Sequence, residues 1–336
     1  MREFKQYYCV YCFFILMRLP THLLEEELKT FEIKFREAVQ SRVALLDRIT
    51  RYIVKRKGKQ LRPMFVLLSA KLFAPVSDSS YRAASLVEIL HTATLIHDDV
   101  VDDAAERRGF FSVYALWKAK ATVLIGDYLL AKGLLLSLDN NDHKILSILS
   151  DAVRKMSEGE LLQIEKARSL NLKEDIYYEI IRNKTASLLA SACAAGAWST
   201  TQDEVLTEKM KKFGELTGMA FQIKDDLFDY ASENVGKPTG NDIKEKKLTL
   251  PLIYALNNVE NGIRKKMIYI IKNENTKKEK VNWVIEQVDK SGGIQYATEK
   301  MFSFRNEALT VLRSLPENPI RQGLEDMVIF VTDRKY

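Results

Sequence analysis

Two short acidic motifs are the residues of this chain best suited to chemistry. Residues 98–102 read DDVVD and residues 225–229 read DDLFD, so both follow the pattern Asp-Asp-x-x-Asp. Apolar residues flank both motifs, and there an unpartnered carboxylate is costly to bury. Like charges that share one helix face also repel each other. A bound cation would offset both costs, and the repetition of the motif suggests two walls of one site.

The spacing within each motif suits a helix. Positions i, i+1 and i+4 lie on one side of a helix, so the first and last aspartates stack one turn apart. Ligand sets made only of oxygen favour a hard cation, and Mg²⁺ usually completes its shell with water and substrate phosphates. A solvated acidic helix face would explain either motif alone, but it explains the pair poorly. The predicted ligands of a metal-bridged diphosphate are Asp98, Asp99, Asp102, Asp225, Asp226 and Asp229.

Basic residues stand where the charge of a diphosphate would need them. Arginine binds phosphate through two parallel hydrogen bonds, whereas lysine supplies a point charge. A solvated surface cation is the simpler interpretation of each residue alone, and only their joint placement supports the prediction. These residues are Lys59, Arg62, Arg107, Arg108, Lys184, Lys237 and Lys247. His91 precedes Asp98 by two helical turns and is a further candidate, whereas we expect His97 to be structural.

Long helices must position these side chains. Residues 76–237 contain no proline, which permits uninterrupted helices. Apolar residues recur at helical spacing over 22–40, 79–102, 121–138, 145–168, 174–200 and 204–230. The stretch 190–198 is apolar nearly all round and should lie centrally. No run alternates as a strand would, so the sequence predicts one all-α domain, broken mainly at 230–248.

Composition excludes several classes of protein. The 336 residues carry a net charge of +6, too mild for a nucleic-acid binder. Three cysteines give no disulfide framework and favour a reducing, cytoplasmic location. The apolar run 7–17 is too short to span a membrane, so no integral span is expected. Residues 1–17 form an N-terminal extension. It faintly resembles a signal peptide, or it precedes a true start at Met17.

Nine sequence segments together resemble the trans-polyprenyl diphosphate synthases, and most closely the long-chain members that make quinone side chains. In order they are GKQLRP at 58–63, HTATLIHDDVVDD at 91–103, RRG at 107–109, GD at 126–127, EGELLQ at 158–163, KT at 184–185, FQIKDDLFDY at 221–230, GKPTGND at 236–242 and KKLTLP at 246–251. One departure is Lys246, which stands where many relatives have glycine.

The resemblance implies an isoprenoid synthase fold over residues 18–336, a single bundle of about 10–13 helices around a central cavity. It implies an allylic diphosphate and isopentenyl diphosphate as substrates, about three Mg²⁺ ions and a homodimer. Lys184, Thr185 and Gln222 match catalytic residues, of which Thr185 and Gln222 would stabilise the reacting carbon cation. The allylic diphosphate would contact Arg107, Lys184, Lys237 and Lys247. Isopentenyl diphosphate would contact Gly58, Lys59, Arg62, His91, Arg108 and Phe221.

The length of the product depends on the space beside the first acidic motif. Ala93 and Thr94 lie one turn before Asp98, and both are small. We therefore expect an open tunnel and a long all-trans polyprenyl diphosphate, made by an enzyme that works in the cytoplasm or near a membrane. Three alternatives stay open: a shorter-chain (C15–C20) synthase, a non-catalytic subunit of a heteromeric synthase, and a terpene cyclase. A cyclase would not need the set Lys59, Arg62 and His91.

Overall fold

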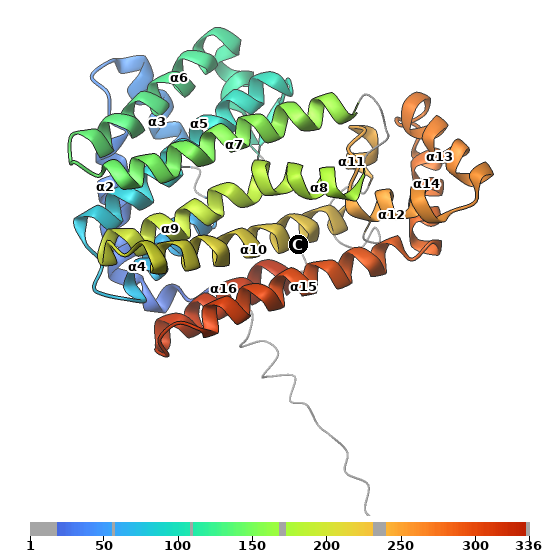
Figure 1. Cartoon of the computed structure of the whole chain (residues 1–336). Coiled ribbons are helices and arrows are strands. Elements are labelled where there is room, and N and C mark those ends of the chain that lie inside the picture. Colours follow the sequence, from blue (N-terminus) through green and yellow to red (C-terminus); the bar gives the residue numbers. More distant parts are fainter. Residues whose placement is uncertain (1–18, 56–57, 108–109, 168–172, 231–239, 334–336) are drawn as a thin grey trace, which may run out of the picture. The chain divides into compact units, whose positions relative to one another are not determined.

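The computed structural model describes residues 19–55, 58–107, 110–167, 173–230 and 240–333, and these residues are almost wholly helical (Figure 1). The helices are η1 (Thr21–Leu23), α2 (Glu25–Ala38), α3 (Ala44–Lys55), α4 (Leu61–Lys71), α5 (Asp78–Val101), α6 (Val113–Leu138), α7 (His143–Ala167), α8 (Glu174–Ile181), η2 (Arg182–Ala186), α9 (Ser187–Thr201), α10 (Glu204–Phe228), α11 (Asn241–Lys244), α12 (Leu250–Asn258), α13 (Asn261–Asn273), α14 (Lys278–Lys290), α15 (Gly293–Arg313) and α16 (Pro319–Asp333). The all-α prediction is confirmed. There are more helices than expected, because short segments such as α11 stand alone.

One small sheet was not predicted. Strands β1 (Glu106–Arg107) and β2 (Phe110–Phe111) pair antiparallel, with Glu106 opposite Phe111 and Arg107 opposite Phe110. Two residues per strand cannot show the alternation that identifies a strand in a sequence. The expectation of no strand was therefore wrong at this hairpin.

The chain divides into two compact units that are interleaved in sequence. Among the described residues, unit 1 comprises 19–23, 158–167, 173–186, 216–230 and 240–333, and unit 2 comprises 24–55, 58–107, 110–157 and 187–215. No single cut in the chain separates them. Each unit contains one of the two acidic motifs, and each is described by itself below.

Unit 2 is built around α5, which packs against α2, α4, α6 and α9. Ser77 caps the start of α5: its hydroxyl accepts a hydrogen bond from the N–H of Ser80, and the Ser80 hydroxyl accepts one from Ser77 in return. Nearly every residue of α9 from Ser187 to Ala197 is buried, which confirms the prediction that this apolar stretch is central. Cys193 lies within it, and burial raises the pKa of its thiol to about 12.

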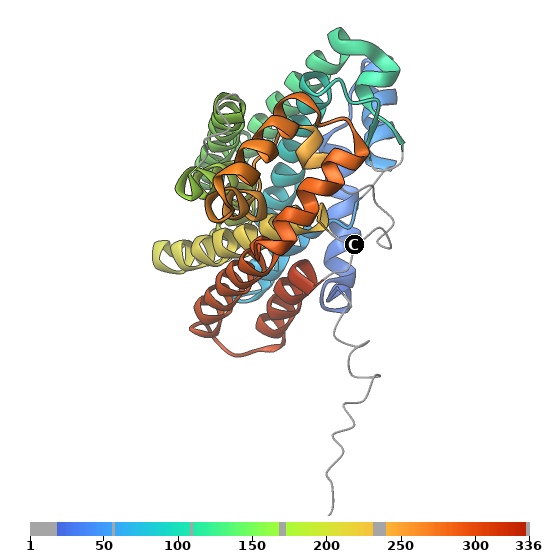
Figure 2. The same ribbon diagram turned by 90° about the vertical axis from the view of Figure 1, so that its right-hand side faces the viewer.

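Two apolar clusters lie among the described residues of unit 1. Residues of α12, α13 and α14 form one, and residues of α8, α10, α12 and α15 form the other. Helices α15 and α16 lie side by side, as the two red helices show in both views (Figures 1 and 2). The buried hydroxyls of Tyr230 and Thr249 are 2.6 Å apart. This contact joins the two sides of the break that follows the second acidic motif.

Both acidic motifs stand at the C-terminal ends of long helices. Helix α5 ends at Val101 and α10 ends at Phe228. The C-terminal end of a helix carries a partial negative charge, so it disfavours carboxylates. The fold therefore adds to the electrostatic cost of each motif, and the predicted need for a cation is stronger than the sequence alone suggested.

A single turn of π-helix, η2, follows α8 directly. The sequence predicted one continuous helix over residues 174–200, and this turn replaces its central part. A π turn bonds i to i+5, is wider than an α-helical turn, and is frequent at functional sites. Lys184 and Thr185 both lie on it.

Helix α6 is the one described helix with the length and apolar composition of a membrane-spanning segment. It has 26 residues, and a third of its most apolar window is buried. Core helices and signal sequences have the same two properties, so this is weak evidence for a membrane span.

Helix α6 also contains a strained residue that yields a stability prediction. Lys118 has φ 66° and ψ 166°, a conformation that is almost restricted to glycine, and its side chain is exposed. We expect Lys118→Gly to raise the free energy of unfolding by about 1 kcal/mol, since such strain costs about 1–3 kcal/mol. Thermal unfolding measures this. Lys120→Gly, at an exposed helical position of α6, should instead destabilise by about 1 kcal/mol. An equal decrease in the free energy of unfolding of both variants would contradict the prediction.

Candidate active site

A cavity of about 240 Å³ in unit 1 gathers much of the predicted chemistry. Helix α10 contributes Gln222, Asp225 and Asp226, and the π turn contributes Lys184 and Thr185. Further lining residues are Gln163 of α7, Tyr177, Ile180 and Ile181 of α8, and Asp242, Lys247, Leu248 and Thr249 from the segment after the break. Carboxylates, ammonium groups, hydroxyls and two amides therefore face one space.

A chain of hydrogen bonds links the π turn to the second acidic motif. The Thr185 hydroxyl donates to Oε1 of Gln222 over 2.7 Å. Nε2 of Gln222 donates to Oδ1 of Asp226 over 2.8 Å, and the buried Tyr177 hydroxyl donates to Oδ2 of Asp226 over 2.6 Å. Both oxygens of Asp226 thus accept hydrogen bonds, and the orientation of the Gln222 amide is fixed from both ends.

The carboxylates of this cavity are electrostatically strained. Burial raises the pKa of Asp226 to about 7, and the charges of Asp242 and Asp225 add to the effect, although the bonds from Tyr177 and Gln222 oppose it. Burial, together with the charge of Asp229, raises the pKa of Asp242 to about 6. A bound cation would relieve this repulsion, so the donor set fits a hard divalent ion.

The carboxylates of this cavity could bind a metal ion only together with other ligands. Among the described residues, no group of three or more His, Cys, Asp or Glu side chains is arranged to hold a metal ion. Mg²⁺ is usually bound through one or two carboxylates plus waters and substrate phosphates. Asp225, Asp226 and Asp242 fit that mode, in which the phosphates of a substrate complete the coordination.

Asp229 has a different environment from its two neighbours in the motif. Its Oδ1 accepts a bond from the N–H of Asn241 over 2.8 Å, and its Oδ2 accepts one from the N–H of Asp242 over 3.1 Å. Asp229 thereby holds the start of α11 and does not line the cavity. Asp242, which follows in the chain, lines the cavity instead.

Two of the predicted basic residues lie in unit 1 within the described ranges. The Lys184 ammonium forms an ion pair with Glu160 and a bond of 3.4 Å to Oε1 of Gln163, both on α7. The Lys247 ammonium is 2.5 Å from Glu245. Phe221 is half-buried on α10. Lys237 lies outside the described residues.

The backbone at Lys246 shows why glycine suits this position in related sequences. Its φ is +59°, in the left-handed region that favours glycine. The chain turns there so that the N–H of Lys247 donates to the carbonyl of Asp242 over 2.8 Å. The lysine side chain stays exposed and donates to the carbonyl of Lys272 over 3.1 Å.

The aspartates of the first acidic motif, in unit 2, differ in exposure. Asp98 is half-buried and Asp99 is 2% exposed, both in the last turn of α5, whereas Asp102 follows the helix end and is exposed. The N–H of Asp102, the C-cap of α5, donates to the carbonyl of Asp98 over 2.8 Å, so the two residues stand one helical turn apart as expected.

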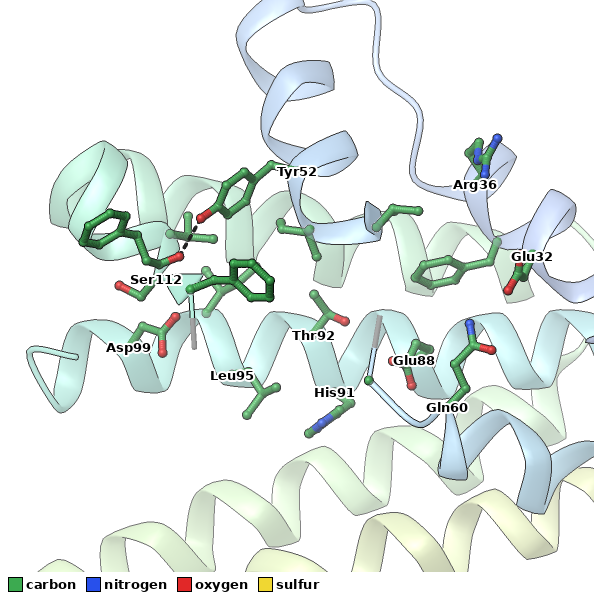
Figure 3. A pocket seen from close by; sticks show the side chains of 18 of the residues that line it. Glu32, Arg36, Tyr52, Gln60, Glu88, His91, Thr92, Leu95, Asp99 and Ser112 are labelled. Carbon is green, nitrogen blue, oxygen red and sulfur yellow. Dashed lines mark hydrogen bonds between the residues drawn. The ribbon is translucent and has the colours of Figure 1, made fainter. Parts of the chain in front are cut away.

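A second cavity, of about 120 Å³, lies within unit 2 between α2, α3, α5 and β2 (Figure 3). Gly58, His91 and Asp99 line it among many apolar side chains. In Figure 3, Asp99 and Thr92 point to one side of α5, and His91 and Leu95 point to the other. Tyr52 closes one end, where its hydroxyl donates to the carbonyl of Phe111 over 2.6 Å.

The remaining predicted residues are dispersed. Lys59 precedes α4 and is exposed, whereas Arg62 lies in the first turn of α4 and is half-buried. Arg107 belongs to β1, and Arg108 lies outside the described residues. Ala93 is fully buried in a cluster with Ile89, Ile125 and Leu129 and lines neither cavity, whereas Thr94 is half-buried. Nε2 of His97 is 3.3 Å from the carbonyl of Val123, consistent with a structural role.

Sequence reasoning gave no role to several residues of the unit 1 site. Tyr177, Glu160 and Gln163 contact Asp226 or Lys184 directly. A signal existed for the last two. They lie three apart on α7, so they share a helix side, within the segment EGELLQ. Nothing in the sequence distinguished Tyr177 from the adjacent Tyr178.

Comparison with known proteins identifies the family. Residues 43–288 match the model of a family described as "Polyprenyl synthetase". The chain belongs to the polyprenyl synthetase family. It is an enzyme that transfers prenyl groups.

Individual relatives match this polyprenyl synthetase over most of their length. It is 35% identical to the all-trans-nonaprenyl-diphosphate synthase (geranyl-diphosphate specific) of Rhodobacter capsulatus, over 89% of this chain and 92% of that one. It is 32% identical to heptaprenyl diphosphate synthase component 2 of Bacillus subtilis, over 95% and 91%. A polyprenyl synthase from Caulobacter crescentus, solved with calcium and isoprenyl diphosphate, aligns with a TM-score of 0.87 at 33% identity, over 94% and 97%.

The raised pKa of Asp226 predicts a pH-dependent stability without metal. Between the ordinary pKa of 3.8 and the folded value of about 7, the folded chain holds a proton that the unfolded chain has lost. The free energy of unfolding should therefore fall as pH rises through this window, by at most about 1.4 kcal/mol per pH unit for one group. Denaturant titrations with EDTA at several pH values measure the slope. Asp226→Asn should flatten it, and an unchanged slope would contradict the assignment.

Proposed function

We propose that this polyprenyl synthetase condenses an allylic diphosphate with successive molecules of isopentenyl diphosphate, in a Mg²⁺-dependent reaction that yields a long all-trans polyprenyl diphosphate. The product would supply the side chain of a quinone. The observation that carries the proposal is the unit 1 cavity, where Asp225, Asp226 and Asp242 face Lys184 and Lys247. Repelling carboxylates beside ammonium groups suit a divalent cation bound together with a diphosphate.

The proposed reaction breaks one carbon–oxygen bond, forms one carbon–carbon bond and releases one proton. The bond between C1 of the allylic substrate and its oxygen breaks, and the electron pair leaves with diphosphate. The double bond of isopentenyl diphosphate then bonds through C4 to C1, and a proton leaves C2 to the released diphosphate. Lys184 and Lys247 stabilise the charge that grows on the leaving group. Bound Mg²⁺ would supply Lewis-acid stabilisation of the same charge.

The π turn and Gln222 would stabilise the carbon cation. The Thr185 hydroxyl oxygen and the amide oxygen of Gln222 are 2.7 Å apart and both residues line the cavity. Their dipoles present partial negative charge to a delocalised cation, and they do so without becoming covalently attached to it. We place them beside the allylic C1, and we assign isopentenyl diphosphate to Gly58, Lys59, Arg62, His91, Arg108 and Phe221.

We further propose a homodimer formed through α6. Six apolar residues of this helix are at least two-fifths exposed: Leu116, Val123, Leu124, Leu134, Leu135 and Leu138. A second copy of the helix would cover them. The alternative of a non-catalytic subunit has one supporting fact, which is that the relative from Bacillus subtilis is named as a component. A shorter C15–C20 product is the other alternative.

One incubation separates these proposals. Purified protein is mixed with farnesyl diphosphate, labelled isopentenyl diphosphate and Mg²⁺, and the dephosphorylated products are compared with polyprenol standards. Long polyprenols support the proposal, and C15–C20 products support the shorter-chain alternative. No product would support a subunit role, and released hydrocarbon would indicate a cyclase. Loss of product with EDTA, restored by Mg²⁺, tests the metal requirement.

The two acidic motifs yield a prediction on turnover. Asp98→Ala and Asp225→Ala should each lower kcat by about 100-fold or more, because each removes charge that holds the metal and diphosphate. The helical circular dichroism spectrum should stay unchanged. Asp139→Ala, at an exposed position just after α6, is the matched control and should keep wild-type activity. Near-normal kcat in either motif variant would contradict the assignment of that motif.

The small residues before the first motif yield a prediction on product length. Ala93→Phe and Thr94→Phe should each shorten the product to about three or four isoprene units, by adding bulk to α5 one turn before Asp98. Ala93 is fully buried, so its replacement can also cost about 1–3 kcal/mol through overpacking. Product chromatography is therefore paired with thermal unfolding. Unchanged product length in both folded variants would exclude a tunnel at this place.

A further inference from the structure

We infer that two glycines on neighbouring helices position the π turn for reaction. Gly159 of α7 and Gly218 of α10 hold the backbone of η2, and with it Lys184 and Thr185, at the site of bond cleavage. This inference rests on the proposed function, and it assigns to Gly159 and Gly218 a positioning role in that reaction.

Gly159 lets α7 lie directly against the π turn. A Cβ at this position would be 2.8 Å from the backbone N of Lys184 and 2.9 Å from Cβ of Asn183. Both distances are shorter than real Cβ contacts, and neither atom belongs to the far end of a flexible side chain. Any side chain at 159 would therefore push the π turn and α7 apart.

Gly218 lets α10 approach the same turn at its last residue. A Cβ here would be 2.6 Å from Cα and 2.8 Å from Cβ of Ala186. Ala186 is fully buried, so it has little room to move away. The π turn thus lies close against two helices at three of its five residues, Asn183, Lys184 and Ala186.

The side chains that act on the substrate are attached at these contacts. Lys184 provides the backbone N that approaches Gly159, and its ammonium contacts Glu160 and Gln163 of the same helix. Thr185 lies between the two glycine contacts and donates to Gln222, one turn beyond Gly218 on α10. Gly159, Glu160 and Gln163 share one side of α7. Helix α7 therefore fixes both the backbone and the ammonium of Lys184.

The close contacts at Gly159 and Gly218 explain how an energetically unfavourable π turn is kept in the fold. A π turn is rare, and it persists where its surroundings hold it in place. Displacing it would move Thr185 away from Gln222 and Lys184 away from the cavity. A misplacement of about 1 Å at a reacting centre can cost about 100-fold in rate. Gly159 and Gly218 would not contact the substrate and would act only through the π turn.

Three alanine substitutions test the inference. Gly159→Ala and Gly218→Ala are compared with Gly262→Ala, since nothing lies within 4 Å of a Cβ at 262 and that glycine is the second residue of α13. Steady-state kinetics give kcat and both KM values, and calorimetry measures binding of a non-reacting thiolodiphosphate analogue of the allylic substrate. Thermal unfolding shows that each variant is folded at the assay temperature.

The expected result separates positioning from general destabilisation. Folded Gly159→Ala and Gly218→Ala should lose about 100-fold in kcat and bind the allylic analogue more weakly, while KM for isopentenyl diphosphate stays unchanged. Gly262→Ala should match the wild type in all measurements. A purely structural role would lower the melting temperature and leave the kcat of folded protein intact.

Two outcomes would overturn the inference, and a third would refute the proposed function. Wild-type kcat in folded Gly159→Ala and Gly218→Ala would overturn the inference while leaving the proposed function in place. Failure of both variants to fold would overturn it too, because the glycines would then be required for the fold itself. Absence of turnover in the wild-type enzyme would instead refute the proposed function.

Discussion

Two clusters of aspartates stand at the negative ends of long helices, and much of the site follows from this constraint. Helix dipoles, burial and mutual repulsion all disfavour the ionised carboxylates around Asp225 and Asp226. A protein that keeps such groups needs a compensating charge, and Lys184 and Lys247 supply only part of it. Under the proposed function, a cation that arrives with a polyanionic substrate would supply the rest. Substrate binding would then also relieve the electrostatic strain.

The helices were predictable because their cause is local. A long stretch without proline and with regular apolar spacing predicted 79–102 and 145–168, and the helices run over Asp78–Val101 and His143–Ala167. The π turn at Arg182–Ala186 was not predictable, because a shift from i+4 to i+5 bonding has no residue signature of its own. It depends on which neighbouring backbones come close, and those contacts arise from α7 and α10.

The candidate site was predictable in composition and less so in detail. Carboxylates in apolar surroundings identified both motifs, since the cost of burying them is visible in the sequence. Which aspartates face the cavity depends on the path of the chain. Asp229 binds the N–H groups at the start of α11, and the same turn brings Asp242 into the cavity. Helical spacing alone cannot reveal such an exchange, because Asn241 and Asp242 lie 12 and 13 residues after Asp229 and outside its helix.

Gln222 links the π turn to the second acidic motif within the unit 1 site. Its amide oxygen accepts from Thr185, so its amide nitrogen must face Asp226, and Tyr177 occupies the other oxygen of that carboxylate. The orientation of each group therefore depends on the others. A carbon cation beside Thr185 and a metal-bound diphosphate beside Asp225 would make opposite electrostatic demands. One hydrogen-bonded chain between them lets a single rigid arrangement meet both, because the amide dipole is already oriented before substrate binds.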